Sequence, residues 1–251
     1  MKTRRKHESG ARGDIVASRN RFGDYDRERV SPNPRPTPAR RRVWDNMAYL
    51  SDLWNRIGEE RRVGWGRLAE EFHSRPRLGQ YGRLDGRLLF LKLNRVLATC
   101  GREPLLDPPP LPQFGPNPVE AFTIIEVKGR VAFQLKLGET PVEDIMIFAS
   151  PPRPAGRAYN SDYGFLGLLP PLQDGQSNFT EQFLTKLKEW RRIRDKKYRV
   201  PLPGAKVFLR AVQQVNGWEY ERGTFRASAF VPVTPAAATM EMGRPPARKA
   251  R

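Results

Sequence analysis

A proline-rich run near the middle of the chain separates two kinds of hydrophobic pattern. Residues 106–118 contain three consecutive prolines and three more close behind them. Proline fixes φ and lacks an amide hydrogen, so such a run cannot continue a helix or form a central strand. Before it, apolar residues recur every three or four positions, and after it every second position. The sequence therefore predicts a helical domain at 37–105, a stiff linker at 106–118 and a β domain at 119–232. A polyproline ligand for an SH3-type partner is the alternative interpretation of the run.

Two short amphipathic helices in a tight hairpin are predicted for residues 44–72. In both, apolar side chains recur in steps of three and four, as on one face of a helix. Gly58 separates the two predicted helices. Thr37 followed by Pro38 fits the start of the first helix, because threonine caps helices and proline suits the first helical position. The apolar positions are Val43, Met47, Leu50, Trp54 and Ile57 before the break, and Trp65, Leu68, Ala69 and Phe72 after it.

A third helix is predicted for residues 85–100. Asp85 is a plausible cap, and Gly101 can supply the left-handed residue that ends a helix. Three such helices can close a small bundle. We expect three tryptophans in its core, because they stand among aliphatic residues at helical spacing; a base-stacking platform is the alternative. The shared face of this helix carries Leu89, Leu93, Val96, Leu97 and Cys100, and the three tryptophans are Trp44, Trp54 and Trp65.

The fold class predicted for the whole chain is α+β, with an antiparallel β-sandwich following the helices. Six short strands with alternating hydrophobicity point to an immunoglobulin-like or fibronectin III-like sandwich, although the cysteine pair of a true immunoglobulin domain is missing. Lys128-Gly129 and Asn216-Gly217 are hairpin turn signals, the second being the stronger. The predicted strands are 121–127, 131–137, 144–150, 163–169, 206–215 and 224–231.

One basic amphipathic helix is predicted inside the β domain, at residues 179–198. Phe183, Leu187, Trp190 and Ile193 fall on one face, and lysines and arginines occupy the rest. Two interpretations stay open. The helix caps the sandwich with a solvated basic face, or it lies against a nucleic-acid backbone.

Both ends of the chain are basic and poor in aliphatic residues. The composition of residues 1–36 predicts a disordered basic arm, which either clamps phosphates or serves as a solubilising leader. Residues 233–251 predict a disordered basic tail.

The net charge of +18 favours a polyanionic partner. Nucleic acid comes first, and an anionic membrane surface or an acidic protein second. Cys100 is the only cysteine, and His7 and His73 are the only histidines, so thiolate zinc sites and histidine-based triads have little support. The glycines match no nucleotide-binding loop. We therefore expect no enzyme, no metal and no cofactor.

The first residues lack the apolar segment of a secretory signal, and no apolar run approaches the roughly 18 residues of a membrane span. We expect a cytoplasmic protein without a transmembrane segment.

Four segments together resemble a family of uncharacterised bacterial and phage-type proteins. They are N-P-R-P-T-P-A-R-R-R-V-W (33–44), L-W-N-R-I-G-E-E-R-R-V-G-W-G-R-L-A (53–69), G-R-L-L-F-L-K-L-N (86–94) and P-L-L-D-P-P (104–109). The resemblance implies paired helices, a proline linker and a β domain over most of residues 33–231. It carries no function to transfer.

Residues 53–69 are also similar to the second helix junction of HMG-box DNA-bending domains. The resemblance covers only this short stretch, and it implies DNA binding by a small helical domain with a basic arm.

Two functions follow from these observations. The first is a non-enzymatic, nucleic-acid-associated binding protein that contacts mainly phosphates through its arm and its basic helix. The alternative is a structural or scaffold module of a phage-like or cell-associated assembly, which forms homo-oligomers through its β-sandwich. The candidate phosphate contacts are Arg4, Arg5, Lys6, Arg40, Arg41, Arg42, Arg61, Arg62, Lys188, Arg191, Arg192, Arg194, Lys196 and Lys197.

Overall fold

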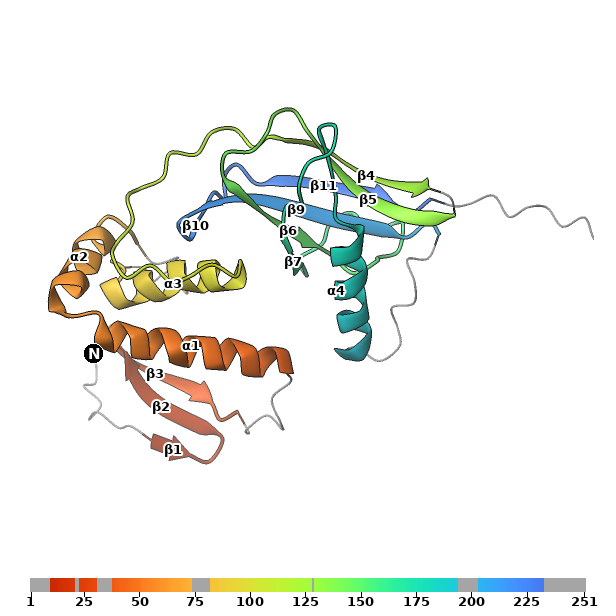
Figure 1. Ribbon diagram of the computed structural model, residues 1–251. Coiled ribbons are helices and arrows are strands. Elements are labelled where there is room, and N and C mark those ends of the chain that lie inside the picture. Colours follow the sequence, from red (N-terminus) through yellow and green to blue (C-terminus); the bar gives the residue numbers. More distant parts are fainter. Residues whose placement is uncertain are drawn as a thin grey trace, which may run out of the picture. The chain divides into compact units, whose positions relative to one another are not determined.

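The computed structural model describes residues 10–20, 23–30, 38–73, 82–127, 129–193 and 203–232. The chain divides into two compact units, Met1–Pro110 and Leu111–Arg251. The described residues form four helices and three antiparallel sheets, so the chain mixes α and β structure (Figure 1).

The three predicted N-terminal helices are present. They are α1 (Pro38–Arg56), α2 (Glu59–Ala69) and α3 (Gly86–Thr99). Gly58, with φ of 84°, separates α1 from α2. The Asp85 carboxylate accepts the Arg87 amide at 3.3 Å and caps α3, while Gly101, with φ of 70°, ends it. The start of α1 at Pro38 is confirmed, and its expected cap Thr37 lies outside the described residues.

The helical unit buries two of its tryptophans to different degrees and exposes the third. Trp65 is fully buried and makes an edge contact with Phe90, at 5.3 Å between ring centroids. Trp54 is half-buried and contacts the same ring, also at 5.3 Å. The prediction that Trp44 is a core residue is wrong, because its side chain is 55% exposed. Burial of α1 is confined to its second half, where Leu50 lies.

The beginning of the proline-rich run packs onto the helices. Asn94 is fully buried, and its amide donates to the Leu105 carbonyl at 3.1 Å while accepting the Leu105 amide at 2.6 Å. Trp65 Nε1 donates to the Leu106 carbonyl at 2.9 Å, and Arg61 pairs with Asp107 at 2.8 Å. These bonds fix residues 105–107 against α2 and α3.

The expected disordered arm contains a three-stranded antiparallel sheet, which corrects the prediction for this part of the chain. Its strands are β1 (Gly10–Arg12), β2 (Ile15–Asn20) and β3 (Gly23–Glu28). Gly13, with φ of 55°, allows the first turn. The apolar residues of this sheet are largely exposed; the Ile15 side chain is 52% exposed. The sequence therefore carries no alternating apolar pattern that would have predicted these strands. Residues 1–9, 21–22 and 31–37 lie outside the described part.

The second unit contains the six predicted strands and two short ones that the sequence did not suggest. One sheet has the order β4-β5-β8; in the other, β10-β9-β6-β7 are joined by β11, which also pairs with β9. Asn216 and Gly217, with φ of 50° and 82°, form the expected turn after β9. The strands are β4 (Val119–Val127), β5 (Arg130–Leu137), β6 (Asp144–Ala149), β7 (Gly164–Leu168), β8 (Gln176–Asn178), β9 (Lys206–Val215), β10 (Trp218–Glu219) and β11 (Phe225–Phe230).

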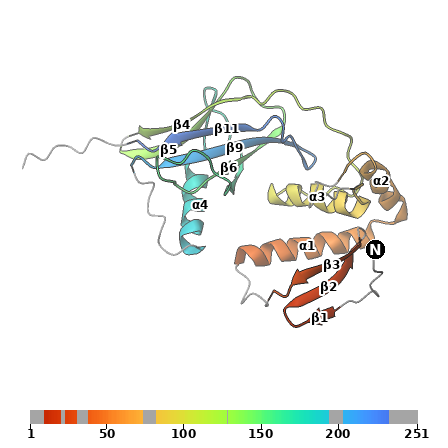
Figure 2. The ribbon, with the colours of Figure 1, turned by 180° about the vertical axis from the view of Figure 1, so that it is seen from behind.

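The predicted basic helix packs into the β unit. It is α4 (Thr180–Ile193), which lies beside the strands of the β unit (Figure 2). Side chains of both sheets and of α4 join one hydrophobic core. Phe183 is fully buried and stacks on Phe133 of β5 at 4.0 Å. At Gly164 of β7, a Cβ would lie 2.6 Å from the Trp190 ring, so a glycine is needed for α4 to approach this closely. Residues 194–202 and 233–251 lie outside the described part.

The end of the proline-rich run belongs to the β unit. Phe114 stacks on Tyr220 at 5.0 Å between centroids. The Asn117 amide donates to the carbonyls of Ala211 and Gly223, at 3.2 and 2.9 Å. The run is therefore bonded at its beginning to one unit and at its end to the other.

Candidate functional site

The outward face of the five-stranded sheet gathers basic and aromatic side chains. Successive side chains of a strand point to opposite faces. In β9, Val207 and Leu209 lie in the core, so Phe208 and Arg210 belong to the outward face.

The register of β11 extends this face. Residues that stand opposite each other in an antiparallel pair share a face, with Cβ atoms about 5 Å apart. Arg226 stands opposite Arg210, and Phe230 stands opposite Lys206. The Lys206 ammonium lies 5.4 Å from the centroid of the Phe230 ring, which is 53% exposed. Cations and rings thus alternate across two neighbouring strands.

A segment of chain, residues 158–163, crosses this face and is held there by Arg153. The Arg153 backbone exchanges two hydrogen bonds with Lys206, both of 2.8 Å. Its guanidinium donates to Asn160 Oδ1 at 3.1 Å and pairs with Asp162 at 3.0 Å. Asn160 is only 8% exposed and donates to the Asp162 carbonyl at 2.7 Å. The crossing segment is therefore fixed by partly buried polar contacts.

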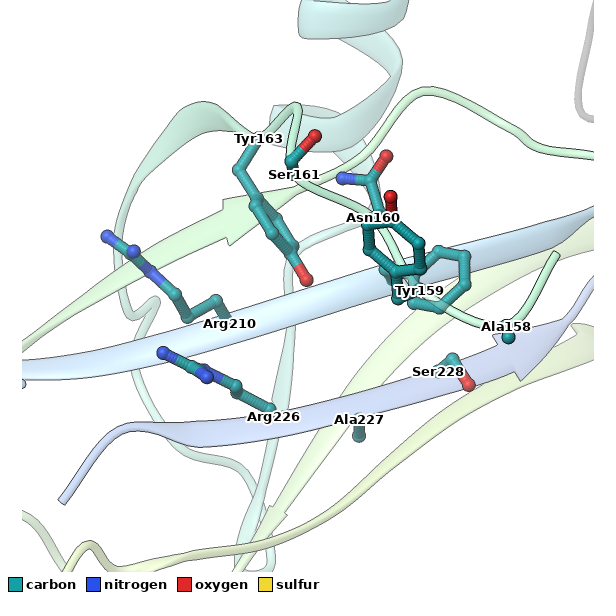
Figure 3. A pocket seen from close by; sticks show the side chains of 10 residues that line it. Ala158, Tyr159, Asn160, Ser161, Tyr163, Arg210, Arg226, Ala227 and Ser228 are labelled. Atoms are coloured by element: carbon teal, nitrogen blue, oxygen red, sulfur yellow. The ribbon is translucent and has the colours of Figure 1, made fainter. Parts of the chain in front are cut away.

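A hollow of about 570 Å³ lies between the crossing segment and the strands β9 and β11. Figure 3 shows the side chains of Arg210 and Arg226 extending in the same direction from neighbouring strands, with Tyr159 and Tyr163 projecting from the crossing segment. The residues that line it are Ala158, Tyr159, Asn160, Ser161, Tyr163, Phe208, Arg210, Arg226, Ala227 and Ser228.

The hollow is positively charged, because Arg210 and Arg226 line it and no acidic residue of the lining balances them. Two like charges directly opposite on a sheet destabilise it, unless a counter-charge lies between them. The lining includes no aspartate or glutamate, and the nearby Asp162 is bonded to Arg153. Within the described part of the chain, neither Arg210 nor Arg226 has an ion-pair partner, and the buried Nε of Arg210 makes no hydrogen bond. An anion is the ligand that this arrangement can hold.

Aromatic rings orient one of the two arginines and offer a free surface beside them. The Arg210 guanidinium lies 4.6 Å from the Phe148 ring and 6.0 Å from the Tyr163 ring, so stacking orients it. The Tyr159 side chain is 72% exposed, with the Arg157 guanidinium 5.9 Å from its ring. A flat group can stack on the exposed part of the Tyr159 ring.

The basic residues predicted in the helical unit lie in two separate places. Those at the start of α1 are exposed, and they stand about 20 Å along the helix from its other end, at 1.5 Å per residue. Near that other end, Arg61 is paired with Asp107, and Arg62 donates to the carbonyls of Trp54 and Asn55. Both of these guanidinium groups thus make bonds within the unit. The exposed residues at the start of α1 are Arg40, Arg41 and Arg42.

Of the basic residues predicted around α4, Lys188 is exposed. Arg191 and Arg192 belong to the last turn of the helix. The remaining candidates lie outside the described residues: Arg4, Arg5, Lys6, Arg194, Lys196 and Lys197.

No family model matches the chain, and comparisons with curated proteins and with solved structures find no match either. In the described part of the chain, no helix has both the length and the apolar character that a membrane span needs.

The residues of the hollow were missed by the sequence analysis. One signal was present. In K-V-F-L-R (206–210) and in R-A-S-A-F (226–230), basic, aromatic and serine side chains alternate with small or aliphatic ones. Such alternation marks an outward face with its own chemistry, whereas the predictions for these strands considered only the inward one.

Proposed function

We propose that the protein is a non-enzymatic, nucleic-acid-associated binding protein, and that the outward face of β9 and β11 is a contact surface. The observation that carries the proposal is the pair Arg210 and Arg226, which stand opposite each other in a hollow whose lining has no carboxylate. The net charge of +18 supports it, because it favours approach of any polyanion. The exposed rings beside the arginines favour nucleic acid over a purely ionic partner.

The basic ends of the chain and the basic face of α4 are proposed as secondary, phosphate-neutralising contacts. Their contribution is electrostatic and insensitive to sequence. It raises affinity for every nucleic acid alike, whereas the outward face adds a localised site.

The proposal is tested by fluorescence anisotropy with a labelled single-stranded oligonucleotide and its duplex, in a titration of salt. The logarithm of the association constant should fall linearly with the logarithm of salt concentration, with a slope of about −0.7 for each phosphate contacted on a single strand. Absence of binding to either probe at low salt would refute the function.

A pair of double variants assigns the binding to the outward face. Arg210→Gln with Arg226→Gln should make the slope shallower by about 1.4, because two phosphate-contacting charges are removed. Arg130→Gln with Lys92→Gln removes the same charge from exposed positions on β5 and α3, neither of which is a proposed contact. It should change the slope by much less. If the second pair weakens binding as strongly as the first, the localised site on the sheet is wrong and diffuse electrostatics accounts for binding.

The scaffold alternative stays a second proposal. Within the described residues, β7 and β8 each pair with one neighbouring strand, so each has an edge that a second copy can extend. The immunoglobulin-like or fibronectin III-like form of the sandwich is also a proposal, supported by the core that the two sheets share. Light scattering after nuclease treatment tests the alternative: a defined oligomer supports it, and a monomer at all concentrations contradicts it.

A further inference from the structure

We infer that the hollow on the outward face receives one nucleoside phosphate unit of a single-stranded nucleic acid, with the phosphate between Arg210 and Arg226 and the base stacked on Tyr159. The inference rests on the proposed function and specifies its substrate. Its three parts are a place for the phosphate, a place for the base, and a reason for a single strand.

The phosphate site follows from the strand register. Because the two arginines are cross-strand neighbours, their guanidinium groups can reach the same anion from adjacent strands. Each guanidinium presents a planar fork of donors that matches the oxygens of a phosphate. Arg210 is already oriented by stacking on Phe148 at 4.6 Å, so it loses less side-chain freedom on binding than a solvated arginine.

The base site follows from the exposure of Tyr159. The Tyr159 ring is 72% exposed and belongs to a segment that is held by partly buried hydrogen bonds, so it presents a flat surface at the edge of the hollow. Stacking on such a ring is tolerant of sequence, because every base has a π face. The hydroxyl groups of Ser161 and Ser228 lie in the same lining and offer polar contacts to a sugar or a base edge.

The aromatic part of the site selects a single strand. In a duplex, the base faces are stacked on their neighbours, and a flat ring reaches them only where bases are unpaired. The volume of about 570 Å³ falls in the range of roughly 300 to 1,000 Å³ that small-ligand sites occupy. An acidic peptide would use the arginines but not the exposed ring, so the ring separates the two partners experimentally.

The experiment compares four probes on the full chain at one salt concentration. They are a labelled strand of about ten nucleotides, within the roughly 4 to 16 nucleotides of known single-strand sites; an abasic strand of the same length; the duplex; and a free mononucleotide. We expect the normal strand to bind most tightly. Equal affinity for the normal and the abasic strand would overturn the inference, and so would a mononucleotide that binds as tightly as the strand.

Variants separate the base site from the phosphate site. Tyr159→Ala should weaken binding of the normal strand by roughly 5-fold to 100-fold, the range found for alanine replacement of a stacking aromatic, and should leave the abasic strand unaffected. Tyr159→Phe keeps the ring and should bind like the wild type. Arg226→Gln should weaken both strands. Because Tyr159 and Arg226 are exposed, both variants should fold, which thermal unfolding verifies.

The binding results distinguish failure of this inference from failure of the proposed nucleic-acid-binding function. Salt-dependent binding that requires Arg226 but is indifferent to Tyr159 and to the bases would remove the inference and leave the proposed function standing. No binding of any strand at low salt would remove both.

Discussion

The contact between α2 and α3 yields a prediction in which the same substitution has opposite effects at two neighbouring glycines. Gly86 begins α3 and faces Gly66 of α2. A Cβ added at Gly86 would lie 2.8 Å from the Gly66 backbone nitrogen, and 3.0 Å from the Gly66 Cα and from the Trp65 carbonyl carbon. A Cβ added at Gly66 would have no atom within 4 Å. The two positions therefore form a matched pair.

The cost at Gly86 is steric, since φ at this residue is not in the left-handed region. Backbone atoms cannot rotate aside as a flexible side chain can, so α2 and α3 must separate by about 0.7 Å to restore an ordinary contact of about 3.5 Å. That movement loosens the packing of Trp65 on Phe90 and its hydrogen bond to Leu106. Overpacking of this kind costs about 1 to 3 kcal/mol, and the better helix propensity of alanine offsets up to about 1 kcal/mol of it.

We expect Gly86→Ala to lower the free energy of unfolding of the helical unit by about 1 to 2 kcal/mol. Gly66→Ala should raise it by about 0.5 to 1 kcal/mol, because alanine stabilises a helix interior relative to glycine. Urea unfolding of the full chain, followed by tryptophan fluorescence and far-ultraviolet circular dichroism, measures both. With a urea dependence of about 2 kcal/mol per molar, the midpoint should fall by roughly 0.5 to 1 M for Gly86→Ala and rise by roughly 0.25 to 0.5 M for Gly66→Ala. A Gly86→Ala variant as stable as the wild type would refute the close approach of the two helices.

Four further substitutions test the packing of the two units. Asn94→Ala removes both hydrogen bonds of a buried amide and should cost about 2 to 3 kcal/mol in urea unfolding; a loss below 1 kcal/mol would mean that the amide is solvated. Phe183→Ala should cost about 3 to 5 kcal/mol, whereas Leu184→Ala, on the exposed side of α4, should cost less than about 1 kcal/mol, and equal losses would contradict the assigned face. Asn117→Ala should accelerate hydrogen exchange of the Val119 amide, which donates to Asn117 Oδ1 at 3.1 Å, and unchanged exchange would argue against that bond.

The helices and the main strands were predictable because their signals are local. The steps of three and four before Gly58 and the capping position of Asp85 each depend on a few adjacent residues. The hydrophobic period does not show how much of a helix is buried by neighbouring elements. Trp44 follows the apolar spacing of α1 yet lies on its exposed first turns, because burial depends on where a partner helix ends, and no property of residues 38–56 records that.

The β1–β3 sheet was missed for the opposite reason. A strand is recognised mainly by an apolar face that alternates with a polar one. Here most described side chains on the three strands are exposed, and Ile15 and Tyr25 are two of the few large apolar or aromatic ones. These strands are defined by backbone pairing and have no buried face. A prediction that uses only the hydrophobic pattern therefore assigns them to a disordered arm.

The proposed binding site could not be predicted from the sequence. It depends on the register between β9 and β11, which the Asn216-Gly217 turn does not set. At the Asn216-Gly217 turn, Trp218 pairs with Val215. Continued along the strands, that register would place Arg226 opposite Val207, on the core face. The observed pairing is with Arg210, because residues 221–224 leave the ladder between β10 and β11 and shift the register by an odd number of residues.

That shift has a structural cause. The Tyr220 ring stacks on Phe114, and Gly223 lies against the same ring, where a Cβ would be 2.1 Å from Cε1. A residue from the end of the proline-rich run thus helps to shape the bulge that turns Arg226 outward. Because an odd shift exchanges the two faces of a strand, the paired arginines exist only while the bulge is kept. Loss of the Phe114 contact should therefore weaken anion binding at a hollow that Phe114 does not line.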